Sequence, residues 1–142
     1  MALTVDDCNL ILQRRCANYL DVAGLSAANG DFVDPIRWAL SLLGVEAASA
    51  VSVADADLTT VTGRKVDALL DLAEARLLQT VLTNLTRVDT RAGMVQQDFS
   101  DLAAMLRPIA ADRLAAAGKR HADLLVAPVD GTGDKVVRLW SV

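Results

Sequence analysis

The sequence predicts an all-α protein: a small helical bundle around a long central helix, with a β-prone C-terminal arm or hairpin. Apolar residues recur every three or four positions through most of the first 118 residues, which is the period of one helix face. Capping residues and glycines stand where such helices would begin and end. After residue 118 two short β-prone runs flank a glycine-containing turn. We therefore divide the chain into a helical domain, 1–118, and an arm, 119–142.

The central helix is expected to begin near Thr62 or Gly63 and to continue to about Val88. Its main apolar stripe is formed by Val66, Leu69, Leu70, Ala73, Leu77, Val81 and Leu85. Three further leucines, at positions 72, 78 and 82, widen the stripe, so neighbouring segments should cover this helix on more than one side. Its acids are interpreted, together with the nearby bases, as a solvated face. These acids are Asp67, Asp71 and Glu74.

Two helices are predicted before the central one. The first spans about 5–22, since Thr4 and Asp7 form a capping signal at its start. The second spans about 35–43, with Asp34-Pro35 at its start and Gly44 at its end. The following segment, residues 45–61, is expected to be a linker with one short helical turn.

The last helix is predicted to begin at Asp98 or Ser100 and to run to Ala117, with Gly118 ending it. Pro108 falls inside this helix. Proline removes one backbone hydrogen bond and clashes with the preceding turn, so we expect a kink there or two shorter helices.

The arm is expected to bind a partner. Leu124–Val129 and Lys135–Trp140 are β-prone runs, and a two-stranded hairpin alone is marginal in water. Its apolar side chains therefore need another surface, and an extended arm can add a strand to a partner's sheet. The residues predicted to make this contact are Val129, Val136, Val137, Arg138, Leu139 and Trp140. Deleting residues 126–142 is expected to leave the helical fold nearly intact but to block assembly.

The sequence offers no combination of residues that predicts catalysis or metal binding. The single histidine, His121, is expected near a helix C-terminus, and no nucleophile can be placed beside it. Cys8 and Cys16 are separated by roughly 12 Å along one helix, too far for a disulfide or a shared metal ion. We interpret them as reduced thiols of an intracellular protein. We expect no enzyme activity, no metal and no cofactor.

Composition predicts an oligomer. Counted with glycine and without tyrosine, apolar residues make up roughly 58% of the chain, against about 45–50% in a typical soluble domain. A chain of 142 residues buries such a surplus less easily than a large one, which favours burial between subunits. The net charge of −4 argues against a surface that grips phosphate backbones. No apolar run of membrane-spanning length and no secretory signal are visible, so we expect no membrane association.

The order of local phrases resembles the head–tail connector (adaptor) proteins of tailed double-stranded DNA phages and related particles. The phrases are R-R-C-A-N-Y-L at 14–20, D-P-I-R-W-A-L at 34–40, V-A-D-A-D-L-T-T-V at 53–61, V-D-A-L-L-D-L-A-E-A-R at 66–76 and L-T-N-L-T-R-V-D at 82–89. The similarity is loose and covers residues 10–117. It is a pattern of helix order and short phrases, without a diagnostic motif.

This resemblance implies a ring, commonly of twelve copies, in the neck of a virion that is made in the host cytoplasm. Such a ring docks beneath the portal protein, carries the stopper or tail, and lets DNA pass through its lumen without specific binding. The C-terminal segment of such proteins often engages the portal or a neighbouring subunit, whereas the hairpin-like turn at 130–134 departs from the simpler helical tails of the family. The alternative from the residues alone is a stand-alone helical module for protein interaction or regulation.

Overall fold

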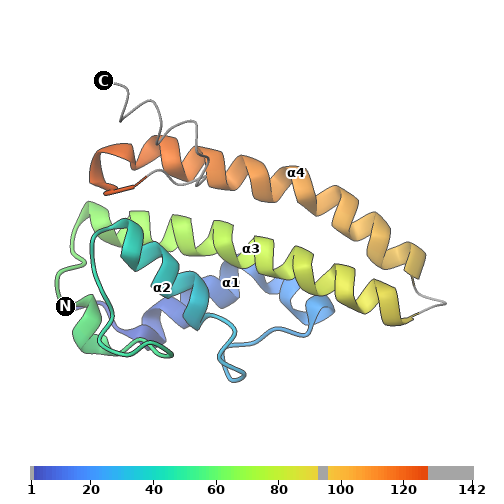
Figure 1. Ribbon diagram of the computed structural model, residues 1–142, viewed down its shortest axis with the longest axis horizontal. Helices are drawn as coiled ribbons and strands as arrows, with labels where there is room; N and C mark the ends of the chain where they lie inside the picture. Colours follow the sequence, from blue (N-terminus) through green and yellow to red (C-terminus); the bar gives the residue numbers. More distant parts are fainter. Residues whose placement is uncertain (1, 93–95, 128–142) are drawn as a thin grey trace.

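The computed structural model describes residues 2–92 and 96–127, and these residues form a helical bundle without β-strands (Figure 1). The elements, in order, are α1 (Val5–Ala23), α2 (Val33–Leu42), the 3₁₀ turn η1 (Asp55–Leu58), α3 (Arg64–Ala92), α4 (Gln96–Arg120) and the 3₁₀ turn η3 (Ala122–Leu124). The predicted all-α class is confirmed, and so is the short turn expected within the linker.

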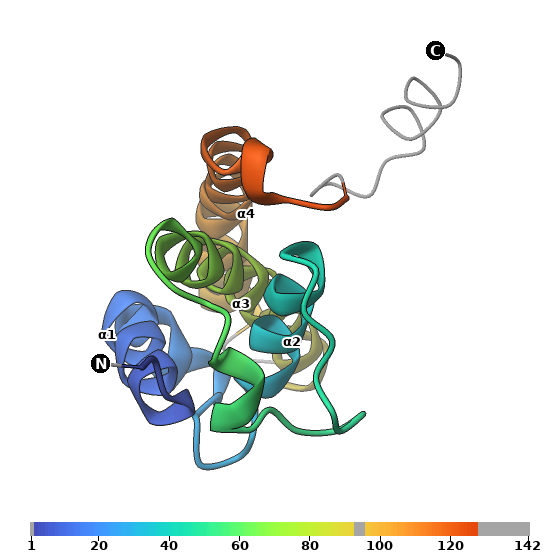
Figure 2. The same ribbon diagram turned by 90° about the vertical axis from the view of Figure 1, so that its left-hand side faces the viewer.

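The long helix α3 lies at the centre of the bundle, as predicted. Viewed along its axis, α4 covers one side of α3, while α1 and α2 pack against the opposite side, one on each flank (Figure 2). α3 and α4 run antiparallel and extend together beyond the ends of α1 and α2 (Figure 1). Three helices therefore bury different faces of α3, which explains why this helix is apolar over more than half of its circumference.

The core is aliphatic and is centred on α3. The predicted stripe is buried from Leu69 to Leu85, while Val66 at its start is only partly buried. Beside the stripe, Leu72 and Leu78 are buried and Leu82 is partly buried. Each fully buried leucine stabilises the fold by about 1.5–3 kcal/mol relative to its exposed state. Among residues 2–85 and 101–127, whose side-chain exposure is described, the exposed large hydrophobic side chains are Leu10, Val22, Val51, Met105 and Val126. In the described residues, then, most of the apolar surplus lies in the core of the single chain.

Helix α1 begins where the capping signal predicts. Thr4 and Asp7 form a reciprocal capping box, and the backbone N–H of Val5 donates to Asp55 Oδ1 at 2.8 Å. This last bond ties η1 to the start of α1. Gly24, with a positive φ of 73°, ends the helix one residue later than expected. Cys8 and Cys16 face the core as free thiols.

The bounds of α2 and α4 differ from the predicted ones: α2 ends at Leu42, one residue early, and α4 begins at Gln96, two residues before Asp98. α2 begins at Val33, because the Ile36 N–H already donates to the carbonyl of Phe32 at 3.1 Å. α4 runs without interruption past Pro108, so the alternative of two shorter helices is wrong. Pro108 lies on the exposed face, where water can reach the backbone carbonyl that loses its partner. Gly118 does not end the helix, which continues to Arg120.

After α4 the chain crosses the end of the bundle towards α2 (Figure 2). It passes through η3, and the Val126 N–H then donates to the Leu42 carbonyl at 2.8 Å. Residues 124–127, the start of the first β-prone run, are not a strand. The remainder of that run and the predicted partner-binding residues lie outside the described residues, so the hairpin stays a prediction. Those residues are Val129, Val136, Val137, Arg138, Leu139 and Trp140.

Candidate functional site

The densest group of charged side chains lies where α1, α3 and α4 meet. α3 contributes Asp71 and Glu74, one turn apart on the same face of the helix. Arg15 reaches them from α1. From the other side come Arg113 and Arg120 of α4 and His121, which directly follows α4. We call these six residues the charged cluster.

Asp71 joins three elements through its two oxygens. Its Oδ1 accepts from Arg15 Nη1 at 3.0 Å, and its Oδ2 lies 3.2 Å from Arg120 Nη1 and 2.8 Å from His121 Nε2. His121 is only 4% exposed, so this carboxylate is the acceptor that satisfies a buried ring nitrogen. The end of α4 is thereby fixed to the middle of the bundle.

Glu74 is more deeply buried, with 6% of its surface exposed. Its Oε1 accepts from Arg15 Nη1 at 3.2 Å, and its Oε2 pairs with Arg113 Nη1. The prediction that Asp71 and Glu74 belong to a solvated face is therefore wrong. α1 and α4 pack against this face of α3 and bring arginines with them, whereas Asp67, one turn earlier, is exposed as expected.

The environment of Asp71 favours the ionised form of its carboxylate. Burial alone would raise the pKa of Asp71, but hydrogen bonds from His121 and Arg15 outweigh it and hold that pKa below its usual value. Three guanidinium groups face two carboxylates, so the cluster carries no excess negative charge. A carboxylate held in this way is a weak base and a poor proton acceptor for catalysis.

Cys16, on the buried face of α1, is not an activated nucleophile. Burial raises the pKa of its thiol to about 12, and the negative charge of Glu74 adds to the increase. The thiol is protonated at neutral pH, and it is the thiolate that reacts. Burial likewise raises the pKa of Cys8 to about 11.

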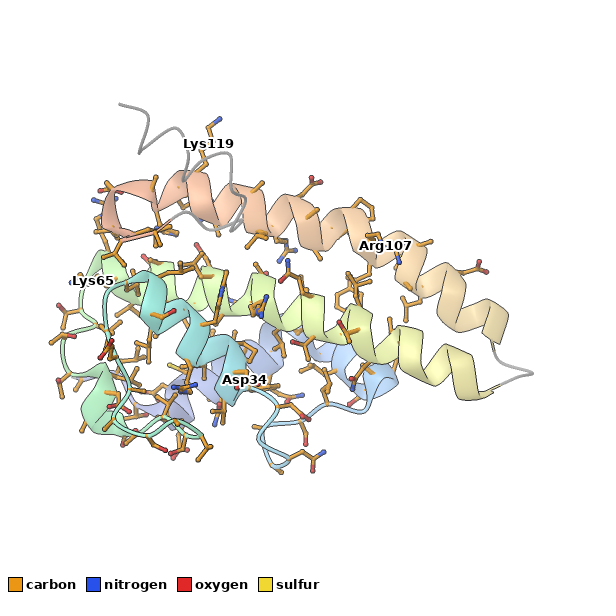
Figure 3. The ribbon with its side chains drawn as sticks, viewed as in Figure 1. Asp34, Lys65, Arg107 and Lys119 are labelled. Atoms are coloured by element: carbon orange, nitrogen blue, oxygen red, sulfur yellow. The ribbon has the colours of Figure 1, made fainter. Side chains whose placement is uncertain are left out.

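Among the side chains that the structure describes, the other charged residues do not gather into a second site. Asp34 lies on α2 and Lys65 on α3, whereas Arg107 and Lys119 lie well apart along α4, where Lys119 points away from the bundle (Figure 3). Within residues 2–92 and 96–127, no group of three or more His, Cys, Asp or Glu side chains is placed to hold a metal ion. None of the helices in this part of the chain has the length and apolarity that a bilayer span requires.

The sequence does contain a signal for the charged cluster. Asp71 and Glu74 are three residues apart, and Arg113 and Arg120 are seven apart, so each pair lies on one helix face. The sequence does not indicate which of these helix faces pack against each other, because the paired residues are separated by 39 to 59 positions along the chain. The geometry indicates that the cluster holds helices together.

Comparison with known proteins adds no relative. The chain matches no protein-family model, no curated protein and no solved structure. The likeness to phage connector proteins therefore rests on the order of the helices and on the short phrases quoted above.

Proposed function

We propose that this protein is a structural subunit of a head–tail connector in a tailed phage or a related particle. In this proposal about twelve copies form a ring beneath the portal protein, extend the DNA channel and present a surface for the stopper or tail. DNA passes through the lumen without being specifically bound. The role is one of assembly, without catalysis.

The observation that supports this proposal is the placement of the resembling phrases on the fold. The phrase at 14–20 lies within α1, and the phrase at 34–40 lies within α2. The phrase at 53–61 contains η1, and those at 66–76 and 82–89 lie within α3. The first two phrases thus lie on the two helices that precede α3, and the last two lie on α3 itself.

The C-terminal arm is the part of the chain to which we assign partner contact. Fifteen residues follow Ala127, and an extended chain of that length reaches roughly 50 Å. This distance is enough to reach a neighbouring subunit or the portal. Because few large hydrophobic side chains are exposed among residues 2–85 and 101–127, we assign much of the adhesive surface to Val137, Leu139 and Trp140 of the arm.

The test is incorporation into particles. The full chain and a variant that ends at Ala127 would be compared by electron microscopy and by mass measurement in solution, alone and with the portal protein. We expect rings or portal-bound rings from the full chain and none from the variant. The cut is placed after Ala127, later than a deletion of 126–142, because Val126 is hydrogen-bonded to α2.

The control for this deletion is the thermal melt of both proteins. Equal melting temperatures would show that the arm acts in assembly without supporting the fold. A full chain that stays monomeric or dimeric and never joins particles would refute the connector role and favour the stand-alone interaction module. A monomer before mixing does not decide the matter, since connector subunits can assemble only on the portal.

A further inference from the structure

We propose that residues 121–127 form a detachable strap. In the free protein the strap is fastened across the end of the bundle, from α4 to α2. When the C-terminal arm binds its partner, residues 122–127 leave α2 and extend the arm. The release step rests on the proposed function of the arm, whereas the fastening is a property of the single chain.

The first end of the strap is anchored in the core. The ring Nε2 of His121 lies 2.8 Å from Asp71 Oδ2. The backbone N–H of His121 donates to the Ala117 carbonyl at 3.1 Å. Leaving this buried ring without its partner would cost the full desolvation of the nitrogen. We therefore place the fixed point of the strap at His121.

The middle of the strap is held at the surface. Arg64 at the start of α3 donates through both terminal nitrogens to the two Asp123 oxygens, at 2.9 and 3.1 Å. The two side chains are 66% and 57% exposed, and ion pairs in water contribute little to stability. η3 contains no buried residue, although Leu124 and Leu125 pack partly against the core.

The far end of the strap is attached by one backbone hydrogen bond. The Val126 N–H donates at 2.8 Å to the carbonyl of Leu42, one of the last carbonyls of α2, which have no partner within the helix. The Val126 side chain is 68% exposed and lies over Gly44, where its Cγ1 is 3.2 Å from the position of an added Cβ. A side chain at position 44 would therefore press against Val126, which would have to shift by a few tenths of an ångström.

The attachment therefore weakens along the strap, from a buried histidine to a single exposed hydrogen bond. Segments with few buried contacts open locally at a small fraction of the global unfolding free energy. Release of six residues would add roughly 20 Å to the reach of the arm. It would also uncover the end of α2 and the apolar side chains of Leu124 and Leu125.

Amide hydrogen exchange of the full chain, followed by NMR, tests the fastening. We expect the Val126 amide to be protected, but at least about tenfold less than core amides of α3 such as that of Leu72. Its exchange should not change in low urea, since local opening exposes little surface. An unprotected Val126 amide would refute the strap. Protection equal to that of Leu72, with the same urea dependence, would refute its detachment.

A matched pair of glycine variants tests the path of the strap. Gly44→Asn and Gly24→Asn both place a side chain at a positive φ, 82° and 73°, which asparagine tolerates better than other residues. An added Cβ meets Val126 only at position 44, since nothing lies within 4 Å at position 24. We expect Val126 to lose roughly five- to tenfold of its protection in Gly44→Asn alone. Equal behaviour of the two variants would contradict the proposed path.

Assembled particles test the release separately. Val126 should lose its protection when the arm is bound, while amides of α3 keep theirs. Continued protection of Val126 in assembled rings would refute release and leave the connector role intact. If the chain never assembles, the connector role and the coupled release fail together, but the measurements on the free chain still decide whether the strap exists.

Discussion

Removing the Asp71 carboxylate should destabilise the bundle far more than removing a neighbouring acid on the same helix. In Asp71→Ala, the buried His121 nitrogen loses its acceptor, which costs about 1–3 kcal/mol. The pairs with Arg15 and Arg120, whose side chains are 34% and 71% exposed, contribute about 0.2–1 kcal/mol each. We therefore expect a total loss of about 1.4–5 kcal/mol.

Asp67 provides the matched control. It is exposed in the first turn of α3, where its charge is worth about 0.3–1 kcal/mol through the helix dipole. Urea unfolding followed by circular dichroism at neutral pH would give the free energies of unfolding of Asp71→Ala, Asp67→Ala and the unmodified chain. If Asp71→Ala costs no more than Asp67→Ala, the cluster does not hold the helices together as inferred.

The same residue predicts how stability depends on pH. Because the pKa of Asp71 is lowered in the folded protein, its contribution is fully present above the unfolded value of about 3.9 and is lost as pH falls through the folded value. Asp71→Asn keeps an acceptor for His121 but does not titrate. Its deficit relative to the unmodified chain, about 1 kcal/mol at neutral pH, should therefore shrink below about pH 4. A deficit that stays constant down to about pH 3 would contradict the assignment.

Three further predictions concern the core, the thiols and the surface pair. Leu77→Ala should lower the free energy of unfolding by about 2–5 kcal/mol, whereas Leu10→Ala, at a half-exposed position, should cost less than about 1 kcal/mol; urea unfolding compares them. Cys16 should react with a thiol reagent at neutral pH only after unfolding, because its pKa is about 12 and it is buried, and rapid labelling of the folded chain would contradict this. Asp123→Asn should change the free energy of unfolding by less than about 1 kcal/mol, since its partner Arg64 is exposed. A larger loss in urea unfolding would show that the strap supports the fold.

The sequence by itself determined the helices and the central position of α3. Apolar residues at helical spacing, on more than one side of a single segment, can be buried only if other helices surround it, and no tertiary information is needed to see this. The start of α1 could also be predicted from the local sequence, since Thr4 and Asp7 form hydrogen bonds with backbone groups within one turn. The prediction that Cys8 and Cys16 do not pair with each other followed from their spacing on one helix.

Only the tertiary structure decided which charged residues are buried in ion pairs and which face solvent. Asp71 looks like Asp67 in the sequence, but Asp71 faces α1 and the end of α4, while Asp67 faces water. The last turn of α4 was also misjudged, because a local rule places a helix end at Gly118, whereas the contact between His121 and Asp71 holds the helix to Arg120. Sequence rules for caps and faces describe interactions within one or two helical turns. The burial of Asp71 and the end of α4 depend instead on residues about fifty positions apart, which only the packing of the helices brings together.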